Sequence, residues 1–361
     1  MSSGLADAPS APLRAAPIAT TARLGLLGTG TVGRAFVARY QALQQRRPGL
    51  PTFAWLANSR TVADCAVTPA QALAAANAAA RTAQAVTLPD DLARGDIVVD
   101  ATASEAVAQR HAEWLRRGVH VVTANKLGQG AALARAEQIH AARHAASTHY
   151  GDSATVGAGL PLLSSLRALV AGGDHIHAVE GVLSGSLAWL LHRYDGRRAF
   201  SECVREAAAA GYTEPDPRED LSGEDVRRKL LILARAAGLP LRAEQVQVES
   251  LVPAALAAVP LAQLDAALAQ LDAPLAARLA QAQAEGACLR FVGRFDAHGA
   301  SVGLRALPST HPLASGAGTD NRVAIHSDRY LQQPLLIQGP GAGADVTAAA
   351  LLDDVLRIAV R

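Results

Sequence analysis

The feature that most constrains the fold of this chain is an apolar run joined directly to a glycine-rich turn. Residues 23–27 are predicted to be a buried strand, and Gly28-Thr29-Gly30-Thr31-Val32-Gly33 follows at once. A helical pattern then continues to Tyr40. Glycines at this G-x-G-x-x-G spacing allow a tight turn, close approach of a pyrophosphate and close packing of helix on strand. Because the helix also begins with unpaired N–H groups, the sequence predicts a dinucleotide-binding turn.

Strands and helices alternate after this turn. The strands are expected at 52–57, 96–100 and 119–123, and the helices at 69–85 and 106–117. Thr68 is a plausible N-cap with Pro69 at the first helical position. This alternation favours an α/β fold with a doubly wound, Rossmann-type parallel sheet. We expect this NAD(P)-binding domain to span residues 22–150, after a disordered tail over 1–21 that is rich in Ala, Pro and Ser.

The pattern changes from Gly151, where strands no longer alternate regularly with helices. The expected helices are 162–171, 200–210 and 225–237, and the expected strands are 178–183, 289–294, 301–306, 323–326 and 335–337. We predict a mixed α+β domain over 151–338. A last helix over 346–358 follows a glycine-rich turn within the C-terminal segment 339–361.

Composition narrows the classes of partner and compartment. The formal net charge of the 361 residues is +2, too small to indicate nucleic acid or a membrane surface. The three cysteines are far apart and match no zinc spacing, which favours a reducing compartment. Since no segment has the length and apolarity of a membrane span or a signal peptide, we expect a cytoplasmic protein.

The end of the second predicted strand bears on which dinucleotide binds. NAD-binding turns of this type usually have an acidic residue there to hold the ribose 2′-hydroxyl. Here the strand ends Ala57-Asn58-Ser59-Arg60, without an acid. Arg60 with Ser59 suits a 2′-phosphate, so NADPH is predicted over NADH. The alternative is that Arg60 is a solvated loop residue.

The helix predicted over 225–237 has a charged pair on its apolar side. Asp225 and Lys229 share an arc with Ile232, Leu233 and Ala236. The other charged residues lie opposite: Glu224, Arg227, Arg228 and Arg235. An ordinary i, i+4 ion pair would face solvent. Burying such an ion pair costs free energy unless further groups form hydrogen bonds with both charges. We therefore favour a lysine that exchanges a proton, with a purely structural buried pair as the alternative.

Two features precede this helix. Ser222 and Asp225 have the spacing of a capping box. The run Gly211-Tyr212-Thr213-Glu214-Pro215-Asp216-Pro217-Arg218-Glu219-Asp220 is acidic and contains two prolines, so it cannot be the interior of a helix. It is either a solvated loop or a rigid loop that offers carboxylates to a cationic amino group.

These residues carry a family resemblance. The stretches 211–217, 220–225 and 229–234 resemble the signature of homoserine dehydrogenases. Residues 124–126, 154–161, 181–187 and 339–348 also resemble that family, in the same order along the chain. The residues of the acidic run and of the C-terminal third most resemble the dehydrogenase half of bifunctional aspartokinase–homoserine dehydrogenases. We expect no kinase domain before this half and no regulatory domain after Arg361.

The resemblance implies reversible, NADPH-dependent reduction of L-aspartate 4-semialdehyde to L-homoserine, in threonine, methionine and isoleucine biosynthesis. Lys229 would donate and accept the proton, with Asp225 beside it. The substrate would contact Glu214, Asp225, Asp220, Tyr212, Lys126 and Ser186. The cofactor would contact Gly28, Thr29, Gly30, Thr31, Val32, Gly33, Arg60, Thr102, Lys126, Gly211 and Gly343. The family further implies that 151–338 is the catalytic and dimerisation domain, which forms a homodimer through its sheet. It also implies that 339–361 returns to the nucleotide domain.

A sodium ion is also implied, held by backbone carbonyls of Ser153, Val156, Ala158 and Leu160. Ser153 stands where the family usually has an acid, with Asp152 one place earlier. Two other functions stay open at this point: a Rossmann-type NADP-dependent dehydrogenase for another aldehyde or hydroxy acid, and a non-catalytic NADP-binding protein. The run from Gly211 to Lys229 argues against both.

Overall fold

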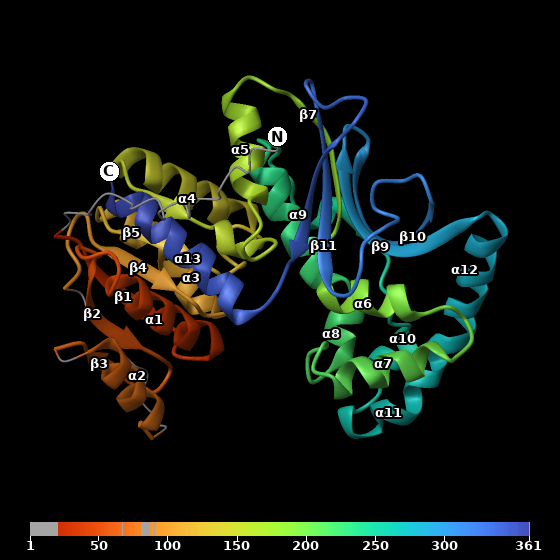
Figure 1. The fold of residues 1–361 in the computed structure, drawn as a ribbon, viewed down its shortest axis with the longest axis horizontal. Helices are drawn as coiled ribbons and strands as arrows, with labels where there is room; N and C mark the ends of the chain where they lie inside the picture. Colours follow the sequence, from red (N-terminus) through yellow and green to blue (C-terminus); the bar gives the residue numbers. More distant parts are fainter. Residues whose placement is uncertain (1–20, 67, 81–86, 90, 361) are drawn as a thin grey trace, which may run out of the picture.

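The computed structural model describes residues 21–66, 68–80, 87–89 and 91–360. The predicted tail therefore lies outside the described residues, apart from residue 21. The chain forms two six-stranded sheets, each with its own helices, which lie side by side (Figure 1). The mixed α/β architecture predicted from the sequence is confirmed.

The first sheet has the strand order β3-β2-β1-β4-β5-β6. Its elements, in chain order, are β1 (Arg23–Leu27), α1 (Thr31–Gln44), β2 (Thr52–Ala57), β3 (Val62–Asp64), α2 (Pro69–Ala78), β4 (Ile97–Asp100), α3 (Glu105–Arg116), β5 (His120–Thr123), α4 (Leu133–Ala146) and β6 (Tyr150–Gly151). Order reverses at β1, where a doubly wound sheet binds its ligand. The sheet is parallel except at one edge, because the unpredicted β3 runs antiparallel to β2.

The second sheet has the order β12-β11-β7-β9-β10-β8. Its strands are β7 (Ile176–Val182), β8 (Val246–Val248), β9 (Ala287–Asp296), β10 (Gly299–Pro308), β11 (Asp320–Ser327) and β12 (Leu335–Pro340). The predicted hairpin is β9–β10. The helices are α5 (Leu162–Ala171), α6 (Gly185–Arg193), α7 (Phe200–Ala209), α8 (Pro217–Leu221), α9 (Glu224–Ala236), α10 (Ala254–Ala257), α11 (Leu264–Ala267) and α12 (Asp272–Ala284).

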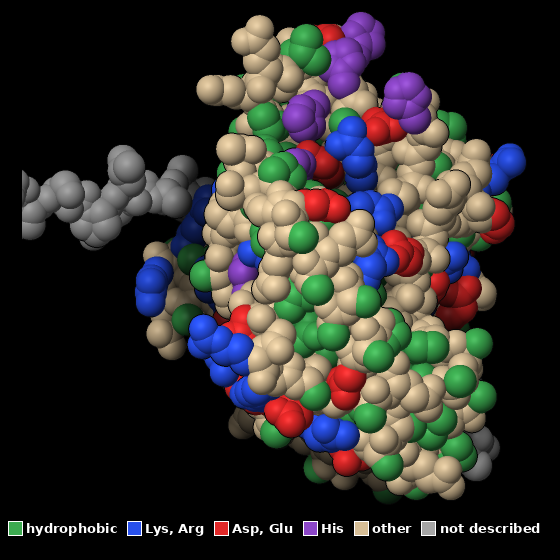
Figure 2. All heavy atoms as spheres, turned by 90° about the vertical axis from the view of Figure 1, so that its right-hand side faces the viewer, with side chains coloured by type: hydrophobic (Ala, Val, Ile, Leu, Met, Phe, Trp, Pro, Cys, Tyr) green, Lys and Arg blue, Asp and Glu red, His purple; other side chains and the backbone are tan. Residues whose placement is uncertain are grey.

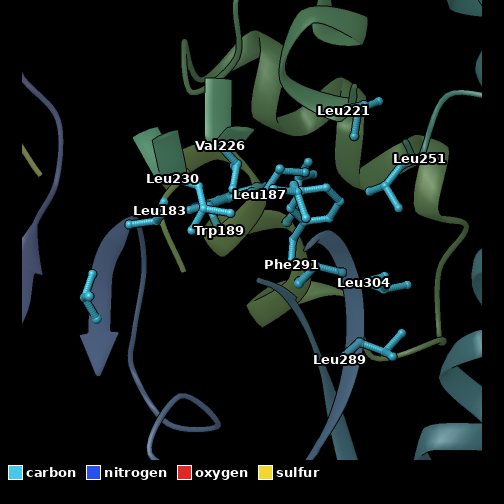
Figure 3. Packing of buried hydrophobic residues seen from close by; sticks show 14 of the residues in the cluster. Leu183, Leu187, Trp189, Leu221, Val226, Leu230, Leu251, Leu289, Phe291 and Leu304 are labelled. Atoms are coloured by element: carbon cyan, nitrogen blue, oxygen red, sulfur yellow. The ribbon is translucent and has the colours of Figure 1, made fainter. Parts of the chain in front are cut away.

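One apolar core lies between the second sheet and its helices. Phe291 and Leu304 of β9 and β10 meet Leu187 of α6 and Val226 and Leu230 of α9 in this core (Figure 3). All five side chains are almost completely buried. Helix α9 is therefore fixed against the sheet along its apolar side, which fixes the position of any charged group on that side.

The last helix, α13 (Ala344–Ala359), returns to the first sheet (Figure 1). Its Leu351 and Val355 share a core cluster with Leu24 of β1 and Phe36 of α1. Sequence positions more than 300 apart thus pack together beside the glycine-rich turn.

Three local expectations were wrong. Helix α2 ends at Ala78, because Ala79 is extended, and residues 81–86 of the predicted helix lie outside the described residues. Ser222 is no capping-box residue: Gly223 caps α9 in a left-handed conformation, with no side-chain cap bond. Part of the acidic run is helical, since Pro217 starts α8 and Asp216 caps it. Proline fits that first position because no helical N–H is needed there.

Along the described part of the chain, no helix combines the length and apolarity needed to cross a membrane. Acidic and basic side chains alternate over the face shown in Figure 2, and histidines gather at one end of it. The three cysteines carry free thiols.

Candidate active site

The glycine-rich turn connects β1 to α1. Gly28 has φ +96°, and a Cβ there would lie 2.7 Å from the carbonyl oxygen of Ala101. A Cβ on Gly33 would overlap the carbonyl oxygen of Gly28. A Cβ on Gly30, by contrast, would meet no atom within 4 Å. Two of the glycines are needed for the protein's own packing, and the third leaves open space in front of the helix N-terminus.

That open space belongs to a cavity of about 860 Å³ at the carboxyl ends of β1, β2 and β4. Among its lining residues are Gly28, Thr29, Gly30, Arg34, Ser59, Arg60, Thr102 and Arg110. A volume of this size is within the range of cofactor sites. Arg34 and Arg110 were not predicted from the sequence, although Arg34 directly follows the last glycine of the motif.

Asn58 fixes the loop that carries Arg60. Its amide Nδ2 donates to Thr29 Oγ1 at 2.8 Å and to the carbonyl oxygen of Ala76 at 2.9 Å. Its Oδ1 accepts from the backbone N–H groups of Arg60 and Thr61. The side chain of Asn58 is thus committed to the loop, and Arg60 is the nearby group that remains for a ligand.

On α9, three charged side chains meet. Lys229 Nζ lies 2.8 Å from Asp225 Oδ2, and Lys126 Nζ lies 3.2 Å from Asp225 Oδ1. Lys229 is 8% exposed, as expected for the apolar side of the helix, while the side chain of Asp225 is 38% exposed. Lys126 comes from the loop after β5, so this cluster joins the two halves of the chain. Leu231 of the same helix is buried as well.

Electrostatics keep Asp225 ionised. Burial acts to raise the pKa of its carboxyl group, but Lys229 and then Lys126 outweigh it, so the pKa lies well below its usual range. Asp225 also stands in the first turn of α9, where the helix dipole favours a negative charge. The carboxylate is therefore a permanent anion between two lysines.

Lys229 is held from a second side by the backbone. Its Nζ donates to the carbonyl oxygen of Leu183 at 2.7 Å. The same oxygen accepts from Asn321 Nδ2 at 3.3 Å, and Asn321 is completely buried. An ammonium group has three N–H donors. Asp225 and Leu183 occupy two of them, and the described residues offer no acceptor for the third.

Asp220 organises the acidic run. Its Oδ1 accepts from Ser186 Oγ at 2.6 Å, and its Oδ2 accepts from the backbone N–H of Glu214 at 2.8 Å. Glu214 itself is exposed. Tyr212 stacks on Trp189, with ring centroids 5.1 Å apart. The run is thus a rigid, anchored loop, which favours the second of its two predicted interpretations.

A buried network that the sequence analysis missed supports Lys126. Asp100 accepts from Thr102 Oγ1 at 2.7 Å and from Asn125 Nδ2 at 3.0 Å. His111 bridges Asp100 and the Tyr150 hydroxyl at 2.9 and 3.0 Å. The Asp-to-His contact is completely buried. The members of this network are spread over 50 residues of the sequence, so no local spacing could have revealed it.

The loop suggested for sodium lies against α13. Ser153 donates from its N–H and its hydroxyl to Asp354, at 3.0 and 2.9 Å. Gly157 and Ala158 both have left-handed φ values, +72° and +49°. The Leu160 carbonyl oxygen already accepts from Leu162 N–H at 2.8 Å. No group of three His, Cys, Asp or Glu side chains suited to a metal occurs among the described residues, so an ion here would need the backbone carbonyls.

The structure thus brings Lys126, Asp225 and Lys229 into one cluster, and Ser186, Asp220 and Glu214 into another. In the described part of the chain, no hydrogen bond or ion pair joins the two clusters.

The remaining predicted cofactor residues lie at the ends of helices. Gly343 precedes α13 with φ +118°, and Gly211 follows the end of α7 with φ +72°. Thr31 and Val32 form the first turn of α1, beside Gly30.

Comparison with known proteins identifies the family. Residues 28–151 match the family model described as homoserine dehydrogenase, NAD binding domain, and residues 161–356 match the model described as homoserine dehydrogenase. The homoserine dehydrogenase of Paracoccidioides brasiliensis (strain Pb18) is 35% identical, over 94% of this chain and 98% of that protein.

Two further similarities differ in coverage. The bifunctional aspartokinase/homoserine dehydrogenase 2 of Zea mays is 45% identical over 73% of this chain, but the match covers only 29% of that longer protein. A crystal structure of a Candida auris protein of unknown function has a TM-score of 0.82 and 35% identity, covering 94% of this chain and 98% of its own. With both family models matched in order and a relative covered almost end to end, the chain belongs to the homoserine dehydrogenase family.

Proposed function

We propose that this protein interconverts L-aspartate 4-semialdehyde and L-homoserine with NADPH as the preferred reductant. The observation that carries the proposal is the cluster of Lys229, Asp225 and Lys126, which joins α9 to the loop after β5. The activity fits the family to which the chain belongs. In this role, residues 22–150 hold the nucleotide, 151–338 hold the substrate, and 339–361 return to the nucleotide domain.

Lys229 supplies the proton at the substrate oxygen. When bound, the nicotinamide exchanges a hydride with the carbonyl carbon, and negative charge then develops on the carbonyl oxygen. The third N–H of Lys229 is available to donate to that oxygen, because Asp225 and the Leu183 carbonyl hold the other two. A charged donor fixed in advance stabilises the developing charge and then delivers the proton. Asp225 fixes the orientation of Lys229 and Lys126.

The amino group of the substrate needs an anion. Glu214 is the exposed carboxylate of the anchored loop, and Asp220 holds the loop in place through the Glu214 N–H. A carboxylate has about four lone-pair sites, so Asp220 and Glu214 can both accept from an ammonium group. Ser186 and Tyr212 complete this end of the site, and Lys126 stands on the nucleotide side.

The cofactor cavity supports NADPH. The space in front of Gly30 fits a pyrophosphate, and Gly28, Thr29, Thr31, Val32 and Gly33 shape the turn around it. Arg60 would meet the 2′-phosphate, which the neutral Asn58–Ser59 end of β2 does not repel. Thr102, Gly211 and Gly343 would border the rest of the cofactor.

Two finer features belong to the same proposal. We propose that backbone carbonyls of Ser153, Val156, Ala158 and Leu160 hold a sodium ion, in the loop where the left-handed residues Gly157 and Ala158 bend the backbone. The sheet of the second half is the surface proposed for a homodimer. Analytical ultracentrifugation and turnover at varied sodium, with potassium as the control, test these features separately.

An absorbance assay tests the main proposal. Purified protein with L-homoserine and NADP⁺ at alkaline pH should generate the reduced-nicotinamide absorbance, faster than with NAD⁺ at the same concentration. The Lys229→Ala variant, which keeps the nucleotide cavity, is the matched control and should generate almost none. No absorbance rise with homoserine from the folded wild-type protein would refute the proposal.

A further inference from the structure

A second cavity, of about 610 Å³, lies at the junction of the two halves. Its walls come mainly from α4, α5, α9 and residues 238–240, and it shares no lining residue with the nucleotide cavity. A ligand here would touch the nucleotide-binding half through α4 and the substrate half through α5 and α9. A cavity of this volume holds a small organic molecule.

The walls combine apolar surface with arginines. Ile139 and Ile232 line the cavity and are almost completely buried. Val170 and Leu239 also line it, and they are among the large apolar side chains that remain exposed, at 38% and 41%. Exposed apolar side chains beside a cavity mark a surface that gains from being covered.

The charges of the walls are unbalanced. Three arginines, Arg143, Arg167 and Arg235, face two carboxylates, Glu137 and Asp152. Arg167 donates two hydrogen bonds of 2.7 Å to the Asp152 carboxylate, so these two charges form an ion pair. Arg235 donates to the backbone carbonyls of Gln129, Ala131 and Leu241, so its charge meets no carboxylate directly. Among the described residues, Arg143 has no ion-pair partner.

From this combination we propose that the second cavity binds a small organic carboxylate with an apolar body, and that its occupancy alters the active site. Arg143 would hold the carboxylate, and Ile139, Ile232 and Leu239 would cover the apolar part. An amine would lose the contact with Arg143 and add to the excess of positive charge. The binding claim stands alone, whereas the claim about the active site rests on the proposed function.

The coupling has a short physical route. Ile232 follows Lys229 by three residues on α9, so the same helix lines the cavity and carries the proposed proton donor. Arg235 ties α9 to the loop that follows Lys126, through Gln129 and Ala131. Tyr150, also in the cavity wall, reaches Asp100 through His111. A ligand that shifts α9 against α4 would therefore move Lys229 relative to Lys126.

Calorimetric titration with benzoate, in saturating NADP⁺ to keep the nucleotide cavity filled, tests binding. Benzylamine is the matched cationic probe. Wild-type protein should bind benzoate and not benzylamine. Arg143→Gln should weaken benzoate binding at least tenfold, and Leu239→Trp, which fills the cavity mouth, should abolish it. Arg39→Gln, an exposed arginine on α1 outside both cavities, should bind as wild type does.

The following results would overturn the proposal, in whole or in part. Equal binding of benzoate and benzylamine, or unchanged benzoate affinity in both cavity variants with wild-type melting temperatures, would refute the carboxylate site. The coupling predicts that saturating benzoate changes the KM for homoserine at least threefold in wild type and not in Arg143→Gln. An unchanged KM despite binding would refute the coupling alone. A protein that binds benzoate but does not oxidise homoserine would refute the proposed function and leave the site standing.

Discussion

In the nucleotide-binding half, six consecutive residues, 28–33, make up the glycine-rich turn and the start of α1, and their proposed contact with the cofactor depends on backbone shape. The charged cluster that joins the two halves draws its groups from separate segments: Lys126, the Leu183 carbonyl, and Asp225 with Lys229 on α9. The first region depends on the absence of side chains, and the second on their exact partners. Substitutions should therefore damage the first through sterics and the second through charge.

The largest effect is expected at the charged cluster. Lys229→Ala removes the proposed proton donor and leaves Asp225 with one lysine. Turnover with homoserine should fall about 10³-fold, in the range for loss of a positioned acid or base, while NADP⁺ affinity stays unchanged. Stopped-flow kinetics and fluorescence titration measure the two quantities. The control is Arg228→Ala, the exposed neighbour on α9, which should keep wild-type turnover. If turnover of the Lys229→Ala variant stays within tenfold of that control, Lys229 is not the proton donor.

The next largest effect is expected from acid, which should lower the free energy of unfolding through His120 before it affects Asp225. In the nucleotide-binding half, burial above all, with His149 and Arg94, lowers the pKa of His120 to about 4. Its Nδ1 accepts from the His149 N–H at 2.9 Å, a bond that protonation would break. Because the unfolded chain binds this proton near pH 6.5, the free energy of unfolding should fall as pH drops from 6.5 to 4, by at most about 3 kcal/mol.

Asp225 loses its contribution in the same direction as His120, with falling pH, but in a lower pH range. Its pKa in the folded state is depressed, so its contribution is present above the unfolded value near 3.9 and is lost only at lower pH. The charged cluster should thus add no slope between pH 6.5 and 4. Urea titrations of wild type and His120→Gln across this range check the assignment, since the variant should lose part of the slope. Parallel curves for the two proteins would show that His120 is not the group responsible.

The glycine turn should divide into two kinds of site. Gly30→Ala adds a Cβ into open space at φ −74°, so stability should be unchanged while the KM for NADPH rises about 10- to 100-fold. Gly33→Ala drives a Cβ into the Gly28 carbonyl and should destabilise the protein by about 1–3 kcal/mol. Thermal unfolding and cofactor titration separate the outcomes. If Gly30→Ala instead binds NADPH normally, the pyrophosphate does not lie in front of that helix.

The same contrast explains what the sequence could predict. Strand, turn and helix around Gly28 are local, and the i, i+4 spacing of Asp225 and Lys229 is local too, so both were found. The Leu183 carbonyl and Asn321 lie 46 and 92 residues from Lys229 and contribute through tertiary packing, which no periodicity encodes. The network of Asp100, His111 and Tyr150 escaped for the same reason. Short β3 was missed because three residues give no readable alternation.

The smallest effect is expected at the edge of the nucleotide cavity. Arg60→Ala should raise the KM for NADPH about tenfold and leave the KM for NADH unchanged, because only NADPH has a 2′-phosphate for a charge-assisted bond. Asn58 fixes the loop through its own hydrogen bonds, so the variant should keep its shape. Arg34→Ala is the comparison, since that arginine lines the same cavity but lies on α1. Equal losses for NADPH and NADH in Arg60→Ala would place Arg60 at the shared pyrophosphate, and Arg34 or Arg110 would then be the groups that read the 2′-phosphate.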